Sequence, residues 1–90
     1  MIRVYADFNA RTADGGCWIL QHGGTDLGAS TAKLGLTSGD RILLYQDDDD
    51  FEVQATLEFR FLSETRSFTW IAYPDWDTVV HPVREMAAHK

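Results

Sequence analysis

Cysteine and cationic side chains are both scarce in this chain. Cys17 is the only cysteine in the 90 residues, which excludes an internal disulfide and a zinc site built from several cysteines. Lysine and arginine together number 8 against 14 aspartate and glutamate residues, and the net charge is −6. A negative domain repels phosphate backbones and anionic lipid, so nucleic acid and membrane surfaces are unfavourable partners.

Long apolar runs are absent as well. No window approaches the roughly 18 apolar residues of a membrane-spanning helix. The start Met1–Tyr5 shows no basic head followed by an apolar run, so no signal peptide is expected and a cytoplasmic location is predicted. Hydrophobic residues nevertheless make up 44% of the chain, which is enough to build the core of one small folded domain.

Alternation of apolar and polar residues is the strongest structural signal. From Phe51 to Phe61 every odd position is apolar and every even position is polar, the period of a strand with one buried face. This pattern predicts that Leu57, Phe59 and Phe61 all face the core. Similar patterns predict further strands over residues 2–8, 17–21, 41–46 and 67–73, with a hairpin turn at residues 63–66.

The glycine-rich stretch between the second and third of these strands predicts one short helix. Thr25 or Asp26 is a suitable N-cap, and Leu27 and Leu34 would share one face of the helix. Gly35 is placed to end it in a left-handed conformation.

The predicted fold class is all-β, or mainly β: a five-stranded, partly closed barrel, SH3-like or OB-like, with a short helix in its long middle connection. Residues 1–81 are expected to form this single barrel domain, and residues 82–90 a C-terminal tail. The stretch Leu36–Leu44 has a Gly-Asp turn followed by arginine and an apolar run, and it resembles the start of a strand in SH3-like and related small barrels. Residues 5–9, 44–48 and 75–76 together are similar to small uncharacterised bacterial β-barrel proteins. These resemblances imply a fold only.

Asp47, Asp48, Asp49 and Asp50 form the most unusual local composition in the chain. Calcium prefers oxygen ligands, but a calcium loop counted from Asp47 has Glu52 where glycine is needed. The run therefore predicts a charged strand junction that discourages edge-to-edge pairing. An acidic patch that faces a partner and a specific metal site are the alternatives.

No catalytic constellation is recognisable. The histidines are not at metal-ligand spacings, and the sequence contains neither a nucleophile elbow nor a phosphate-binding loop. Cys17 is expected to be a small buried residue beside Trp18. Asp75, Asp77 and Asp7 are more typical of turns than of an acid–base pair. We therefore predict no enzymatic activity, no cofactor and no bound metal.

The aromatic residues favour a role in protein interaction. Phe68, Trp70 and Trp76 are predicted to lie mainly in the core, whereas Tyr5 and Tyr45 fall on the polar side of their strands and predict an exposed face suited to a protein partner. The leading hypothesis is a non-enzymatic interaction module that binds another protein or itself. Its predicted binding residues are Tyr5, Tyr45, Asp47, Asp48, Asp49, Asp50, Asp75 and Trp76. The alternatives are a small nucleic-acid-binding barrel that uses Trp70, Trp76 and the arginines, and a carboxylate-based metal-binding protein.

Overall fold

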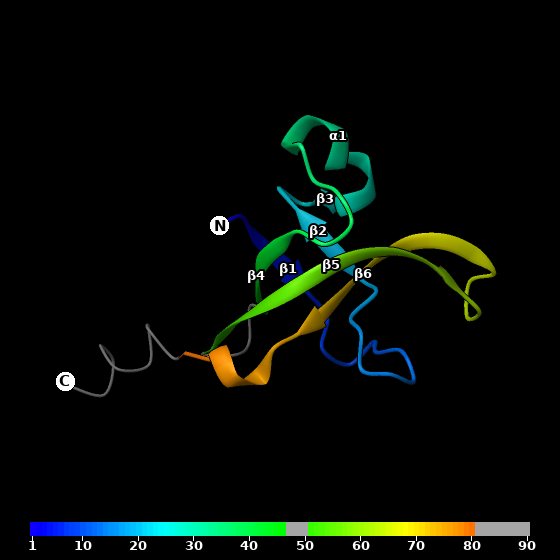
Figure 1. The fold of residues 1–90 in the computed structure, drawn as a ribbon. Coiled ribbons are helices and arrows are strands. Elements are labelled where there is room, and N and C mark those ends of the chain that lie inside the picture. Colours follow the sequence, from blue (N-terminus) through cyan, green and yellow to red (C-terminus); the bar gives the residue numbers. More distant parts are fainter. Residues whose placement is uncertain (47–50, 81–90) are drawn as a thin grey trace.

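The computed structural model describes residues 1–46 and 51–80, which form a sheet with the strand order β3-β2-β1-β4-β5-β6 (Figure 1). Strand β1 is parallel to β4, and every other neighbouring pair is antiparallel. The strands are β1 Arg3–Ala6, β2 Leu20–His22, β3 Thr25–Asp26, β4 Arg41–Tyr45, β5 Glu52–Leu62 and β6 Ser67–Pro74. The helices are η1 Leu27–Ala29, α1 Thr31–Leu34 and η2 Trp76–Thr78.

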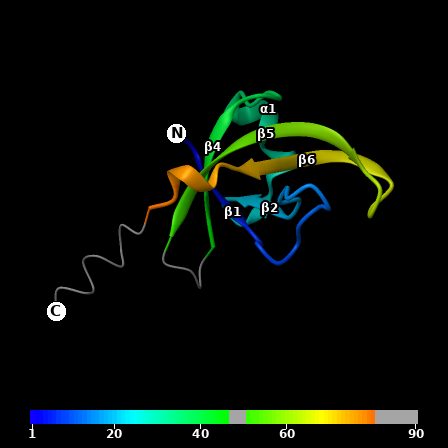
Figure 2. The same cartoon turned by 60° about the horizontal axis from the view of Figure 1, so that its bottom comes forward.

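The mainly β prediction is confirmed, but the predicted barrel is not, because the described residues form an open sheet of six strands. The outer edge of β6 meets Cys17 in one antiparallel bridge to Ala72, with N–O distances of 2.7 and 2.9 Å. Cys17 precedes β2, and one bridged pair is not a ladder between β2 and β6. The sheet is therefore curved but not closed into a barrel (Figure 2). Strand β3 was not predicted, because a two-residue strand is too short to show alternation.

The first strand of the chain lies inside the sheet. Strand β1 pairs with β2 on one side and with β4 on the other, where Val4 lies opposite Leu44. A parallel pair requires a long crossover, and here β2, β3, η1 and α1 provide it. Val4 and Ala6 are fully buried, whereas Arg3 and Tyr5 lie on the other face, as the alternation predicts.

Two short helices replace the single helix that was predicted. The Asp26 carboxylate caps η1 by accepting a hydrogen bond from the Gly28 N–H at 2.9 Å, and Leu27 is buried. Helix α1 ends at Gly35, whose φ of 70° is the left-handed stop that was expected. Gly28 disfavours one continuous helix across this segment. No helix in the described part of the chain is long and apolar enough to cross a membrane.

The β5–β6 hairpin is the longest element of the fold. Strand β6 pairs along its whole length with Ala55–Leu62 of β5, but β4 accompanies β5 only over Glu52–Thr56. The distal half of the hairpin therefore projects beyond the other strands in both views (Figures 1 and 2). The predicted turn at residues 63–66 is present, with Arg66 in a left-handed conformation at φ 55°. Pro74 ends β6, as expected of a residue that cannot donate a backbone hydrogen bond.

The core lies on one face of the sheet and ends part-way along this hairpin. Its fully or almost fully buried members are Val4, Ala6, Cys17, Leu20, Leu27, Ile42, Leu44, Val53, Ala55, Leu57 and Ala72. The alternation along β5 is confirmed as far as Leu57. The prediction that Phe59 and Phe61 are buried is wrong, since they are 48% and 57% exposed. Beyond the Leu57–Ala72 pair the hairpin has left the body of the sheet, and little remains to cover its core face.

Candidate functional site

The parallel β1–β4 pair brings Tyr5 and Tyr45 together. They lie opposite each other in the register, and their rings meet edge-on with centroids 5.9 Å apart. The guanidinium carbon of Arg3 lies 4.2 Å from the centroid of the Tyr45 ring, and Arg3 Nε donates to Glu52 Oε2 at 2.8 Å. With Gln21, both tyrosines line a shallow cavity of about 340 Å³. The two rings share one face, as their strand positions predicted, but both are half-buried and already engaged.

Asp75 and Trp76 lie where β6 passes into η2. Asp75 Oδ1 accepts a hydrogen bond from the Asp77 N–H at 3.2 Å, and Asp75 Oδ2 lies 3.4 Å from Arg41 Nη2. Asp75 thus has the turn-forming role that the sequence predicted. The Trp76 ring packs 6.0 Å from Phe51, yet 44% of the residue is exposed, so the prediction of a core position was wrong for Trp76.

The predicted aspartate run Asp47–Asp50 lies outside the described residues, and so does the predicted tail over residues 82–90. Within residues 1–46 and 51–80, no group of three or more histidine, cysteine, aspartate or glutamate side chains is placed to hold a metal ion. A cation site at the aspartate run stays a prediction.

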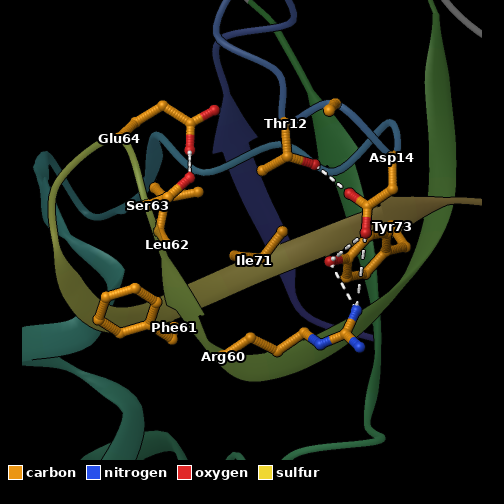
Figure 3. Close-up of a pocket in the computed structure, with 10 residues that line it drawn as sticks. Thr12, Asp14, Arg60, Phe61, Leu62, Ser63, Glu64, Ile71 and Tyr73 are labelled. Carbon is orange, nitrogen blue, oxygen red and sulfur yellow. Dashed lines mark hydrogen bonds and ion pairs between the residues drawn. The ribbon is translucent and has the colours of Figure 1, made fainter.

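A cavity of about 520 Å³ lies between the loop of residues 11–16 and the distal hairpin (Figure 3). On one side of it, Arg60 Nη1 donates to Tyr73 Oη at 2.9 Å and lies 3.7 Å from Asp14 Oδ2. The Thr12 hydroxyl donates to the other oxygen of the same carboxylate. The lining residues are Thr12, Ala13, Asp14, Arg60, Phe61, Leu62, Ser63, Glu64, Ile71 and Tyr73.

These contacts favour the ionised forms of Asp14 and Arg60, two of the three charged residues that line the cavity. The Thr12 hydrogen bond is the main cause that lowers the pKa of Asp14 below 3.8, and burial opposes it only in part. The Tyr73 hydrogen bond is the main cause that raises the pKa of Arg60. Carboxylate and guanidinium neutralise each other, so an incoming anion would have to displace Asp14. Neither of these two groups is suited to proton transfer near neutral pH.

Cys17 is fully buried, as the sequence predicted, and it is not activated. Removal from water is the main cause that raises the pKa of its thiol to about 11, and the nearby Arg11 offsets this only in part. The thiolate is the reactive form of cysteine. At neutral pH Cys17 therefore stays protonated, and its position favours packing over nucleophilic chemistry.

The same thiol should make the protein less stable in alkali. The unfolded thiol, with a pKa near 9.0, loses its proton while the folded thiol keeps its proton up to about pH 11, so the free energy of unfolding should fall across this window. The full decrease is about 2–3 kcal/mol. Urea unfolding at about pH 8 and about pH 10.5 measures it, with the Cys17→Ala variant as the reference for all other titrations. Equal pH dependence in the two proteins would contradict this assignment.

The feature that sequence reasoning missed is a row of exposed aromatic rings on the distal hairpin. Phe59, Phe61 and Phe68 are 48%, 57% and 63% exposed, and Trp70 is half-buried beside them. In the register Phe59 lies opposite Trp70, and Phe61 opposite Phe68. Ring centroids are 5.0 Å apart for Phe59–Trp70, 5.8 Å for Phe59–Phe68 and 5.6 Å for Phe61–Phe68. We call these four side chains the aromatic face.

No family model, curated protein or solved structure matches the chain.

The aromatic face continues the core face of the sheet into solvent. Cross-strand partners share a face, and every second residue of a strand returns to it. The pairs Phe59–Trp70 and Phe61–Phe68 therefore follow the buried Leu57–Ala72 pair along the same side of the hairpin. The four rings contact one another along this side of the hairpin.

Proposed function

We propose that this protein is a non-enzymatic, cytoplasmic protein-interaction module whose binding surface is the aromatic face. The observation that carries the proposal is the exposure of Phe59, Phe61 and Phe68 by about half or more on one side of a projecting hairpin. At about 200 Å² for each phenylalanine, they expose about 340 Å² of aromatic surface. The largest apolar patch on a typical monomer is about 300–600 Å², and such a patch is often functional.

The magnitude of the burial supports specific but moderate binding. Covering about 340 Å² of apolar surface contributes about 8 kcal/mol at 25 cal/mol/Å². Loss of translational and rotational freedom costs at least about 4 kcal/mol, and ordering of side chains adds to that. Aromatic residues are enriched at the centres of protein interfaces, whereas charged residues are depleted there. The nearby charges Glu58 and Arg60 alternate with the rings along β5 and lie on the opposite face of the hairpin.

The tyrosine pair is the weaker candidate surface, because Tyr5 and Tyr45 are half-buried and already contact each other. The nucleic-acid alternative has less support. Trp70 packs with Phe59 on the hairpin, whereas Trp76 belongs to a separate aromatic cluster beyond the end of β6. These two tryptophans do not form one stacking platform of the kind that single strands require.

An affinity-capture experiment tests the proposal. The chain and a Phe61→Ser, Phe68→Ser double variant serve as baits in a native extract. Removal of central aromatic contacts typically reduces binding about tenfold or more, so the double variant should lose the proteins that the chain retains. Val80→Ser is the matched control, because it removes an exposed apolar side chain that lies beside Glu52 at the start of β5, at the other end of the strand from Phe61. Equal capture of the same proteins by all three baits, or no capture by any, would refute the proposal.

A further inference from the structure

We infer that a second copy of this chain adds its own β6 antiparallel to β6 about a two-fold axis at Thr69, which joins the two aromatic faces edge to edge. This inference rests on the proposed function, since it names the partner of the same surface. Three observations on β6 support it. The edge of β6 is free over the length that such a pairing uses, this edge carries no charge, and the aromatic rings lie beside it.

The first observation is the free edge. The Ala72 N–H and C=O point outward from the sheet, because both bond to Cys17. Backbone groups of an antiparallel strand alternate in direction, so those of Phe68 and Trp70 point toward the same edge. Among the described residues no strand pairs with this edge over Ser67–Ile71. The distal half of β6 therefore offers donors and acceptors in the register that another strand needs.

The length of this edge suits a two-fold pairing. The hairpin turn bounds it on one side, and the bridge at Ala72 bounds it on the other. Antiparallel pairing centred on Thr69 uses all of it, because Ser67 then lies opposite Ile71 of the other copy. Phe68 lies opposite Trp70 of the other copy, and these two residues exchange both backbone hydrogen bonds.

The second observation is the absence of charge. Ser67–Ile71 contains no ionisable side chain, although the chain has a net charge of −6. Exposed edge strands in monomers are usually protected by charged residues. In a two-fold antiparallel pairing the residue on the axis meets its own copy, so a charge at Thr69 would face a like charge. An uncharged edge is therefore the composition that suits a second copy, whereas a partner recognised by its charge would find no complement here.

The third observation is the position of the rings. Pairing of the two β6 edges places the aromatic faces side by side on the core side of one continuous sheet, with Phe68 of one copy against Trp70 of the other. This pairing covers the strand edges and the ring edges that meet across the axis, not the whole of the two faces. The contact is therefore smaller than the 1,200–2,000 Å² that stable interfaces bury, and we expect a dissociation constant of about 1–100 µM.

Sedimentation velocity of the full chain from about 1 to about 500 µM tests the dimer. The informative variant is Thr69→Glu. Thr69 lies opposite Arg60 within the hairpin, so the new carboxylate has a cation as neighbour in the monomer. In the dimer it faces its own copy at the closely spaced, non-hydrogen-bonded position. We expect the dissociation constant to rise at least about tenfold. Ala32→Glu is the matched control, because it adds the same charge at an exposed position on α1 and should leave dimerisation unchanged.

Phe68→Ser is a second variant. Phe68 is 63% exposed, and its replacement weakens the contact between the two copies without adding a charge. Thermal unfolding confirms that each variant is folded. A chain that stays monomeric to about 500 µM overturns the inference, and so does a dimer that Thr69→Glu and Phe68→Ser leave intact. If the chain is monomeric but Phe61→Ser with Phe68→Ser still abolishes capture of another protein, the second copy is excluded while the proposed function stands.

Discussion

Leu57→Ala is expected to lower the free energy of unfolding by about 2–5 kcal/mol, whereas Phe61→Ala, four residues along the same strand and face, should change it by less than about 1 kcal/mol. Leu57 is fully buried, so its truncation loses transfer free energy and leaves a cavity. Phe61 is 57% exposed, and its ring contacts Phe68, which is also exposed. Removal of that ring therefore opens no space in the core.

Urea unfolding of the two variants beside the parent chain measures this contrast, provided that the slope with denaturant stays constant. The measurement is made at low protein concentration, so that self-association does not contribute to stability. Similar losses for both variants would mean that the core extends to the end of the hairpin, and the aromatic face would then not exist as a free surface.

Gly16→Ala is expected to cost about 1–3 kcal/mol through overpacking alone. A Cβ at residue 16 would lie 2.4 Å from Ile71 Cγ2 and 3.0 Å from Tyr73 Cε1. Its backbone is outside the left-handed region, so alanine itself is tolerated there. The loop of residues 11–16 packs on β6 through this glycine, and a methyl group would push the loop away.

A double-mutant cycle isolates that contact. Ile71→Ala removes the methyl group that an alanine at residue 16 would meet, so the double variant should be more stable than the sum of the single losses by about 1–2 kcal/mol. Gly15→Ala is the matched control. It has a φ of +92° and meets nothing nearer than Arg11 Nη2 at 4.0 Å, so it is strained but should not couple to Ile71. Strict additivity for Gly16→Ala with Ile71→Ala would contradict the packing described here.

The strand positions were predictable because alternation is a local property of the chain. The period-two pattern correctly placed β5 and the buried side of Val53, Ala55 and Leu57. What it could not show is how far along the strand the core extends, since this depends on which other strands lie alongside. The difference in length between the predicted strands 41–46 and 51–61 was the available signal, because a short strand cannot accompany the whole of a long one.

The open sheet could not be read from the sequence for a similar reason. Strand β1 pairs with β4, which lies about forty residues further along the chain. A parallel pair between such distant segments has no local sequence signature. Of the predicted binding residues, Tyr5 and Tyr45 were correctly placed on one face, and Asp75 in a turn. The aromatic face was missed because Phe68 resembles a core residue in a sequence pattern, and only the fold leaves it uncovered.

The central place of β1 in the sheet has a consequence for synthesis on the ribosome. Residues 3–5 align with residues 43–45, which are made about forty residues later. At about 5–20 residues per second this delay is about 2–8 seconds. Through that interval Val4 and Ala6 have β2 as their only neighbour strand among those already made, whereas the β5–β6 hairpin closes as soon as it is complete. Strand β1 therefore gains its second neighbour only when β4 has been made, and deletion of residues 1–6 would divide the sheet between β2 and β4.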